Sequence, residues 1–186
     1  MLKRSLFLAG GAMLAAGAAH AQSITVLGTN ADAMACYRAA DSELRRPDAV
    51  RICGAALASR DLNDRDRMAT FVNRGIVQFR LDNQNAAIAD FDAALTIEPG
   101  QPDALINRGI AMIAGGADLG AATATIEQGL AGRPQRPWVG YYGLAVAHEL
   151  AGRDAQAYRD YRRARDMRPG WSPAELALSR FTVRGF

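Results

Sequence analysis

The chain has 186 residues, of which 22 are basic and 19 are acidic. Two of the basic residues, Lys3 and Arg4, lie in an N-terminal segment that we expect to be removed, which leaves 20 basic against 19 acidic side chains. This near balance gives no electrostatic reason to expect a nucleic-acid partner. The remaining 165 residues suit one domain that buries roughly two-thirds of its unfolded surface.

The first 21 residues have the three-part layout of a secretory signal peptide. Lys3 and Arg4 precede an apolar run over 6–19, which ends in the small-x-small pattern of residues 19–21. The run is shorter than the roughly 20 residues that span a bilayer, although an uncleaved anchor is the alternative. We expect cleavage near Ala21 and an exported chain, periplasmic or secreted, without stable membrane insertion.

Residues 22–66 are predicted to form a degenerate N-terminal helix pair and a linker. Ala31–Ala40 and Pro47–Ser59 have the pattern of two helices. The charged run Asp61–Arg67 is predicted to be a solvated linker that caps the next helix. A calcium loop is the alternative, but the ligand order and the glycine of such a loop are missing.

An internal repeat dominates residues 67–169. The segment Phe71–Ile76 recurs as Leu105–Ile110 at an offset of 34 residues. Two further series recur at intervals of 35 residues: Pro99, Pro134 and Pro169, and Phe91, Ile126 and Tyr161. Helical spacing of apolar residues predicts two helices in each unit, and a proline ends each unit. The units span about 68–101, 102–136 and 137–169.

Within each unit a small residue is expected to face a large one, because antiparallel helices approach closely only at such contacts. This pattern of small, aromatic and proline positions resembles that of the tetratricopeptide-repeat (TPR) family. Unit one matches it at Phe71, Gly75, Ala87, Phe91, Ala94 and Pro99; unit two at Leu105, Gly109, Ala122, Ile126 and Pro134, with Gly129 where alanine is usual; unit three at Tyr141, Leu144, Ala157, Tyr161, Ala164 and Pro169, with Ala145 in place of glycine. The resemblance implies an all-α solenoid of helical hairpins, in which neighbouring units stack into one core.

Both cysteines fall in the N-terminal helix pair. Cys36 and Cys53 are 17 residues apart, as are Arg74 and Phe91 of unit one, which places the two sulfurs on facing helices. An even number of cysteines in an exported chain favours a disulfide. We therefore predict that Cys36 and Cys53 are bonded, with two buried free thiols as the alternative.

Residues 170–186 are predicted to form a capping helix, from Trp171 to Arg180, and a tail. Ser172 is the expected N-cap and Pro173 a first-turn residue. The tail 181–186 has the pattern of a strand or a docking segment.

In TPR proteins the first helices of the pairs line a concave groove that binds peptides. Projected onto this chain, the groove would be mostly apolar, with two amides. Positions that carry a basic clamp for C-terminal carboxylates in some family members hold Val72, Ile76, Ile106 and Ile110, so that clamp is not expected. The alternative is internal coverage of this face by the N-terminal unit or the C-terminal helix. The predicted groove residues are Val72, Asn73, Ile76, Phe79, Arg80, Ile106, Asn107, Ile110, Ile113, Tyr142, Val146 and Glu149.

The sequence offers little catalytic chemistry. His148 is the one histidine beyond the predicted signal peptide, and its neighbour Glu149 points in another direction on a helix. Asp90 and Asp92 are expected to solvate the outer surface. We predict no catalytic residue, no metal and no cofactor. The leading hypothesis is a periplasmic scaffold that binds a protein or peptide; a self-associating envelope protein, possible as a homo-oligomer, and an accessory domain of an enzyme are the alternatives.

Overall fold

The computed structural model describes residues 2–4, 21–42 and 44–183, so most of the predicted signal peptide lies outside the described residues. The described part is α-helical apart from two short strands. The elements are β1 (Leu2–Arg4), α2 (Ala31–Asp41), α3 (Pro47–Ala58), α4 (Asp64–Arg80), α5 (Gln84–Ile97), α6 (Pro102–Ala114), α7 (Leu119–Ala131), α8 (Pro137–Leu150), α9 (Asp154–Met167), α10 (Ser172–Leu178) and β2 (Phe181–Val183).

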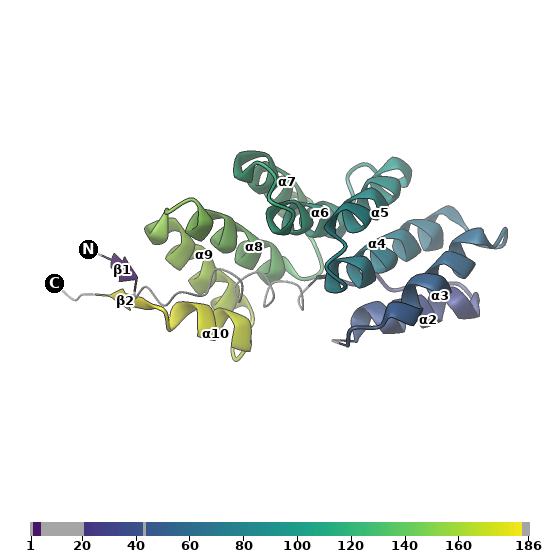
Figure 1. Cartoon of the computed structure of the whole chain (residues 1–186), viewed down its shortest axis with the longest axis horizontal. Helices are drawn as coiled ribbons and strands as arrows, with labels where there is room; N and C mark the ends of the chain where they lie inside the picture. Colours follow the sequence, from purple (N-terminus) through teal and green to yellow (C-terminus); the bar gives the residue numbers. More distant parts are fainter. Residues whose placement is uncertain (1, 5–20, 43, 184–186) are drawn as a thin grey trace.

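Consecutive helices pack as antiparallel pairs, and the four pairs form an arch (Figure 1). The pair α2–α3 lies at one foot of the arch and α10 at the other, while α6 and α7 lie at its top. One hydrophobic core runs through all the pairs. The predicted all-α solenoid of helical hairpins is confirmed.

Side-chain caps begin α2, α4, α6 and α7. Asn63 accepts a hydrogen bond from the backbone N–H of Asp66, which begins α4 at Asp64, four residues before the expected start. The prediction of a solvated linker was therefore wrong for residues 64–67, because they form the first turn of α4 and Asp66 is buried. Ser172 does not cap α10, whose N-cap position is Trp171.

Three consecutive residues in unit one contact three different neighbours. Asn73 points to the concave side, Arg74 makes an ion pair with Asp90 of α5, and Gly75 lies against the ring of Phe91. A Cβ at Gly75 would lie 2.6 Å from Cε1 of Phe91. Only glycine therefore allows α4 and α5 to approach this closely, which confirms the predicted small-to-large contact.

The same three residue types recur in unit two. Asn107 points to the concave side, Arg108 reaches Asp92 at 2.6 Å, and a Cβ at Gly109 would lie 2.5 Å from Ile126. Since Arg74 and Arg108 bind α5 from either side, that helix is held by ion pairs to both neighbours. The prediction that Asp90 is solvated was wrong, because it is buried against Arg74.

The predicted disulfide joins Cys36 of α2 to Cys53 of α3, with the Cα atoms 4.9 Å apart. Both residues are fully buried. The bond cross-links the pair that departs most from the repeat pattern, so it compensates for a core built there mainly from alanines.

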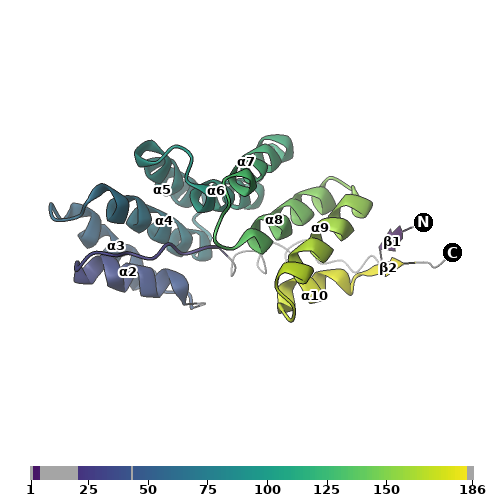
Figure 2. The ribbon, with the colours of Figure 1, turned by 180° about the vertical axis from the view of Figure 1, so that it is seen from behind.

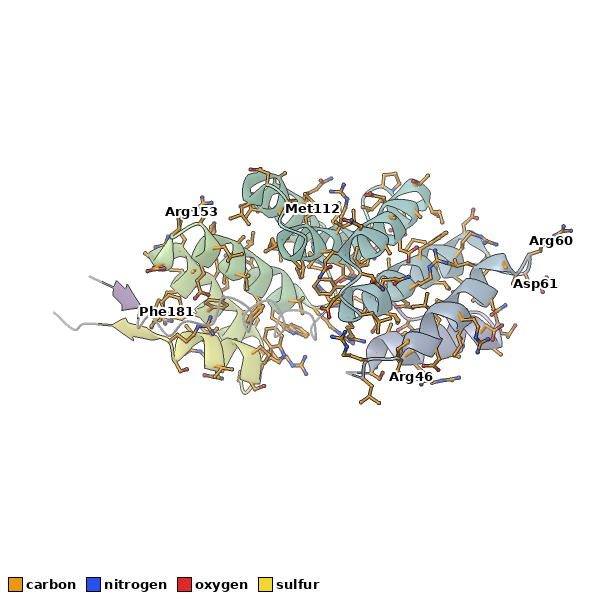
Figure 3. All side chains as sticks on the ribbon, in the orientation of Figure 1. Arg46, Arg60, Asp61, Met112, Arg153 and Phe181 are labelled. Carbon is orange, nitrogen blue, oxygen red and sulfur yellow. A yellow bond between two sulfur atoms is a disulfide. The ribbon has the colours of Figure 1, made fainter. Side chains whose placement is uncertain are left out.

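The C-terminal residues cover the end of the array. Trp171 packs edge-on against Tyr142 of α8, and Phe181 lies against Tyr158 and Tyr161 of α9. Figure 3 labels Phe181 at this end of the array. The strand β2 pairs antiparallel with β1, with Arg4 opposite Phe181. The C-terminal segment thus acts as a cap, which repeat arrays require.

Removal of the disulfide should lower stability. In the chain-entropy model, a loop of this length is worth about 3 kcal/mol, so Cys36→Ala with Cys53→Ala should lower the free energy of unfolding by about that amount. Urea denaturation of the oxidised chain, the reduced chain and the variant measures it. Equal midpoints for the oxidised and reduced chains would contradict the bond.

Two glycine substitutions should have opposite effects. Gly75→Ala should cost about 1–3 kcal/mol, because its Cβ overlaps the Phe91 ring. Gly54→Ala, in the middle of α3 with open space around it, should instead stabilise by about 0.5–1 kcal/mol. Thermal unfolding of both variants tests this pair, and a similar change in both would show that the contact at Gly75 is not tight.

Candidate peptide-binding face

The twelve predicted groove residues lie on the first helices of the three units, on α4, α6 and α8. We call this set the inner face. All twelve are buried, and the most exposed, Ile110, retains 9% of its accessible surface. The inner face is therefore covered by other parts of the chain, and the structure identifies them.

Residues 21–29, which we call the N-terminal segment, cover the part of the inner face formed by units one and two. The segment is extended and runs from the start of α2 towards the loop before α8 (Figure 2). Ile24 and Val26 are buried in the same hydrophobic cluster as the inner-face isoleucines, whereas Thr25 and Leu27 are exposed. Over residues 24–27 this alternation is that of a strand with one buried side, whereas Gln22 and Ser23 are both buried.

Two asparagines hold the backbone of the segment. Asn73 Oδ1 accepts from the N–H of Ile24 at 2.9 Å, and Asn73 Nδ2 donates to its C=O at 2.8 Å. Asn107 makes the same pair of bonds with Gln22, both at 2.9 Å. The N–H and C=O of residues two apart point to the same side of an extended chain, so successive repeats bind alternate residues.

The pattern of paired amides ends at unit two. In unit three the position that matches Asn107 is Gly143, which lies against Ile110 and has no side chain that could hydrogen-bond. In the N-terminal pair the position that matches Asn73 is Ala35. The two asparagines therefore define a binding site for three consecutive residues of extended chain.

Polar groups fix both ends of the segment. Asp66 accepts from the N–H of Leu27 at 2.9 Å and is itself bonded by Asn63. At the other end, the backbone N–H of Arg136 donates to the side-chain oxygen of Gln22 at 3.1 Å. The segment is thus bound by backbone or side-chain groups at residues 22, 24 and 27.

Ser23 makes a further polar contact, with α2. Its hydroxyl donates to Asp41 at the end of α2 at 2.8 Å, and the guanidinium of Arg136 reaches the same carboxylate at 3.2 Å. The bond from Ser23 and the bond and charge of Arg136 lower the pKa of Asp41.

The remaining inner-face residues contact other elements. Arg80 donates to the carbonyls of Ala40 and Ser42 at the end of α2, and so takes the place of a C-cap. Glu149 accepts from the Tyr161 hydroxyl at 2.7 Å and pairs with Arg180 at 3.0 Å. Burial beside this carboxylate strongly raises the pKa of Tyr161. These contacts link the inner face to the N-terminal pair and the cap.

Sequence reasoning missed the residues that complete the site. Asp66 and Arg136 hold the N-terminal segment and Gln22 belongs to it, but none of the three was among the predicted groove residues. One signal was available, since the run from Ser23 to Val26 alternates polar and apolar residues in the pattern of a strand.

His148 has a partner that the sequence did not indicate. Its Nδ1 lies 2.8 Å from Asp160 Oδ2, and the pair joins α8 to α9. Within residues 2–4, 21–42 and 44–183, no three potential ligand side chains are grouped for a metal ion. No helix in these same ranges has the length and apolar character of a membrane span.

No protein-family model and no curated protein matches the sequence. Solved structures do share its fold. The first TPR domain of the human RPAP3 protein matches with a TM-score of 0.55 and 18% identity, over 60% of this chain and 87% of that one. The crystal structure of MamA matches with a TM-score of 0.55 and 18% identity, over 70% of this chain and 72% of that one. At this identity the likeness establishes the fold, a TPR-like helical solenoid.

Substitution of Ser23 should change the titration of Asp41. Since folding lowers the pKa of Asp41, its contribution to stability is present above the unfolded pKa of about 3.9 and is lost as pH falls through the folded value. Ser23→Ala should raise the pKa of Asp41 towards its ordinary value, as measured by carboxyl-carbon NMR. An unchanged titration would show that the hydroxyl does not bind this carboxylate.

Proposed function

We propose that the chain is a non-enzymatic protein-interaction scaffold, exported to the periplasm, that binds an extended polypeptide on its inner face. The observation that carries the proposal is the pairing of Asn73 and Asn107 with both backbone groups of alternate residues in an extended segment. The TPR-like fold, which presents the first helices side by side on a concave surface, supports it.

The chemistry of this face suits a polypeptide ligand. A primary amide both donates and accepts, so one asparagine satisfies the N–H and the C=O of the same residue. Each such bond contributes about 0.5–1.5 kcal/mol net, and more is lost if a buried amide stays unpaired. The isoleucines of the inner face add burial of apolar side chains. An extended backbone with apolar side chains satisfies both needs.

Export and a non-enzymatic role are supported by different features of the chain. The signal-like N-terminus and the buried disulfide support export to an oxidising compartment. The proposed non-enzymatic role is supported by the contacts of the one described histidine, which bridges two helices, and by the use of the inner-face polar groups in structural hydrogen bonds.

A double substitution tests the scaffold function. Asn73→Ala with Asn107→Ala removes both paired amides, so crosslinking in the envelope of the native cell should recover a partner with the parent chain and lose at least tenfold of it with the variant. Mass spectrometry of the purified crosslinked complexes measures the yield.

The matched control is Asn83→Ala with Asn85→Ala, two exposed asparagines near the start of α5. It changes the same number of amides and should retain the partner. Both variants must first show the helicity of the parent by circular dichroism. Equal recovery with both pairs of substitutions would place the binding surface elsewhere, and a size that rises with protein concentration would favour self-association.

A further inference from the structure

We infer that the N-terminal segment is a built-in competitor for the inner face, and that its register defines the class of partner. That partner is an extended, uncharged segment whose residues at the positions of Gln22, Ile24 and Val26 point inward, and whose position equivalent to Thr25 faces solvent. This inference rests on the proposed function and specifies its ligand.

The register follows from burial. Gln22, Ser23, Ile24 and Val26 are each at most 7% exposed, so a charged side chain at any of these positions would be buried. Thr25 lies between two of them and is exposed, so it accepts any side chain. Asn73 and Asn107 bind only backbone atoms of the segment. Their side-chain amides therefore require an extended backbone but do not select particular amino acids. The pockets for alternate side chains supply the selectivity, as in strand-type peptide recognition.

The segment is an imperfect ligand, which makes it displaceable. Among the described residues, the side-chain nitrogen of Gln22 has no hydrogen-bond partner, although the residue is 1% exposed. A buried donor without an acceptor weakens binding. A partner with a side chain that fits this position better gains an advantage over the segment. The segment compensates by its tether, which gives it a high effective concentration.

The connection between the N-terminal segment and α2 allows the segment to leave the inner face without unfolding a helix. Leu27 is 62% exposed, Thr29 is exposed, and α2 begins at Ala31 with its own cap, Asn30. The disulfide holds α2 to α3 independently of the segment. The disulfide, the cap of α2 and the two ion pairs of α5 involve none of residues 21–28, so none of these contacts is broken when the segment leaves the inner face.

A cleavable tether tests the inference on the full chain. A protease recognition sequence is inserted between Gly28 and Thr29, the chain is purified after export, and half of the preparation is cut in the native state. A fluorescent peptide with the sequence of residues 22–28, the part of the segment that remains after the expected signal cleavage, is the probe, and anisotropy measures its affinity. We expect the peptide to bind the cut chain at least tenfold more tightly than the uncut chain, because only the cut segment exchanges.

Two peptide variants test the register. Ile24→Asp should lose at least tenfold in affinity for the cut chain, because it buries a charge, whereas Thr25→Asp should lose less than threefold, because position 25 is exposed. Asn73→Ala with Asn107→Ala in the cut chain should also lose at least tenfold. Equal losses with the two peptides would overturn the register.

Other outcomes would contradict the inference that the N-terminal segment competes for the inner face. Equal affinity of the parent peptide for cut and uncut chains would show that the segment does not occupy the inner face. Loss of helicity on cutting, or a segment that stays bound under excess peptide, would show that it is a permanent part of the core. A dimer of the uncut chain that exchanges segments between copies would overturn the intramolecular contact.

The outcome is independent of partner capture in the envelope. If the peptide exchanges as expected but the crosslinking experiment yields no partner, the competitor stands and the scaffold function fails. If a partner is captured through Asn73 and Asn107 but the peptide does not exchange, the scaffold function stands and the competitor fails.

Discussion

The first helix of a repeat in this array makes contacts on three sides at once. An α-helix allows this because consecutive side chains point about 100° apart around its axis. In units one and two the sequence Asn-Arg-Gly provides these contacts. The glycine brings the second helix close, the arginine binds a carboxylate on α5, and the asparagine is left to face the concave side. The position of the inner-face amides is therefore set by the same packing that builds the repeat.

The inner face is energetically unfavourable when no segment covers it. Asn73 and Asn107 are buried among isoleucines, and each is satisfied by the backbone of the N-terminal segment. Without a ligand, these amides would return to water and the isoleucines would form an exposed apolar surface. A chain that supplies its own extended segment avoids that state, while any partner must bind better than the segment to replace it.

The repeats could be predicted from the sequence because their signals are local. The recurrence of Phe71–Ile76 at Leu105–Ile110 and the spacing of the prolines fixed the helix pairs, and the alignment of Cys36 with Arg74 led to the disulfide. Asp66 and Asp90 were misassigned as solvated because their burial depends on partners outside their own turn, the N-terminal segment and Arg74.

The coverage of the inner face was harder to predict. Internal burial by the N-terminal unit or the C-terminal helix was the alternative for this face, but the sequence did not identify residues 21–29 as the segment that covers it. Ile24 lies 49 positions from Asn73 in the sequence, and Gln22 lies 85 positions from Asn107. No repeat pattern relates the members of either pair. Backbone recognition leaves no side-chain signature in the bound segment, so only its strand-like alternation could have indicated its place.

Amide hydrogen exchange of the N-terminal segment, resolved by residue with NMR, shows whether Asn73 holds this segment on the inner face. The N–H of Ile24 is bonded to Asn73, whereas the described part of the chain provides no acceptor for the N–H of the exposed Thr25. Slow exchange at Ile24 beside fast exchange at Thr25 is the expected result, with the protection at Ile24 lost in Asn73→Ala. Equally fast exchange at both residues would contradict a bound segment and leave the inner face without its ligand.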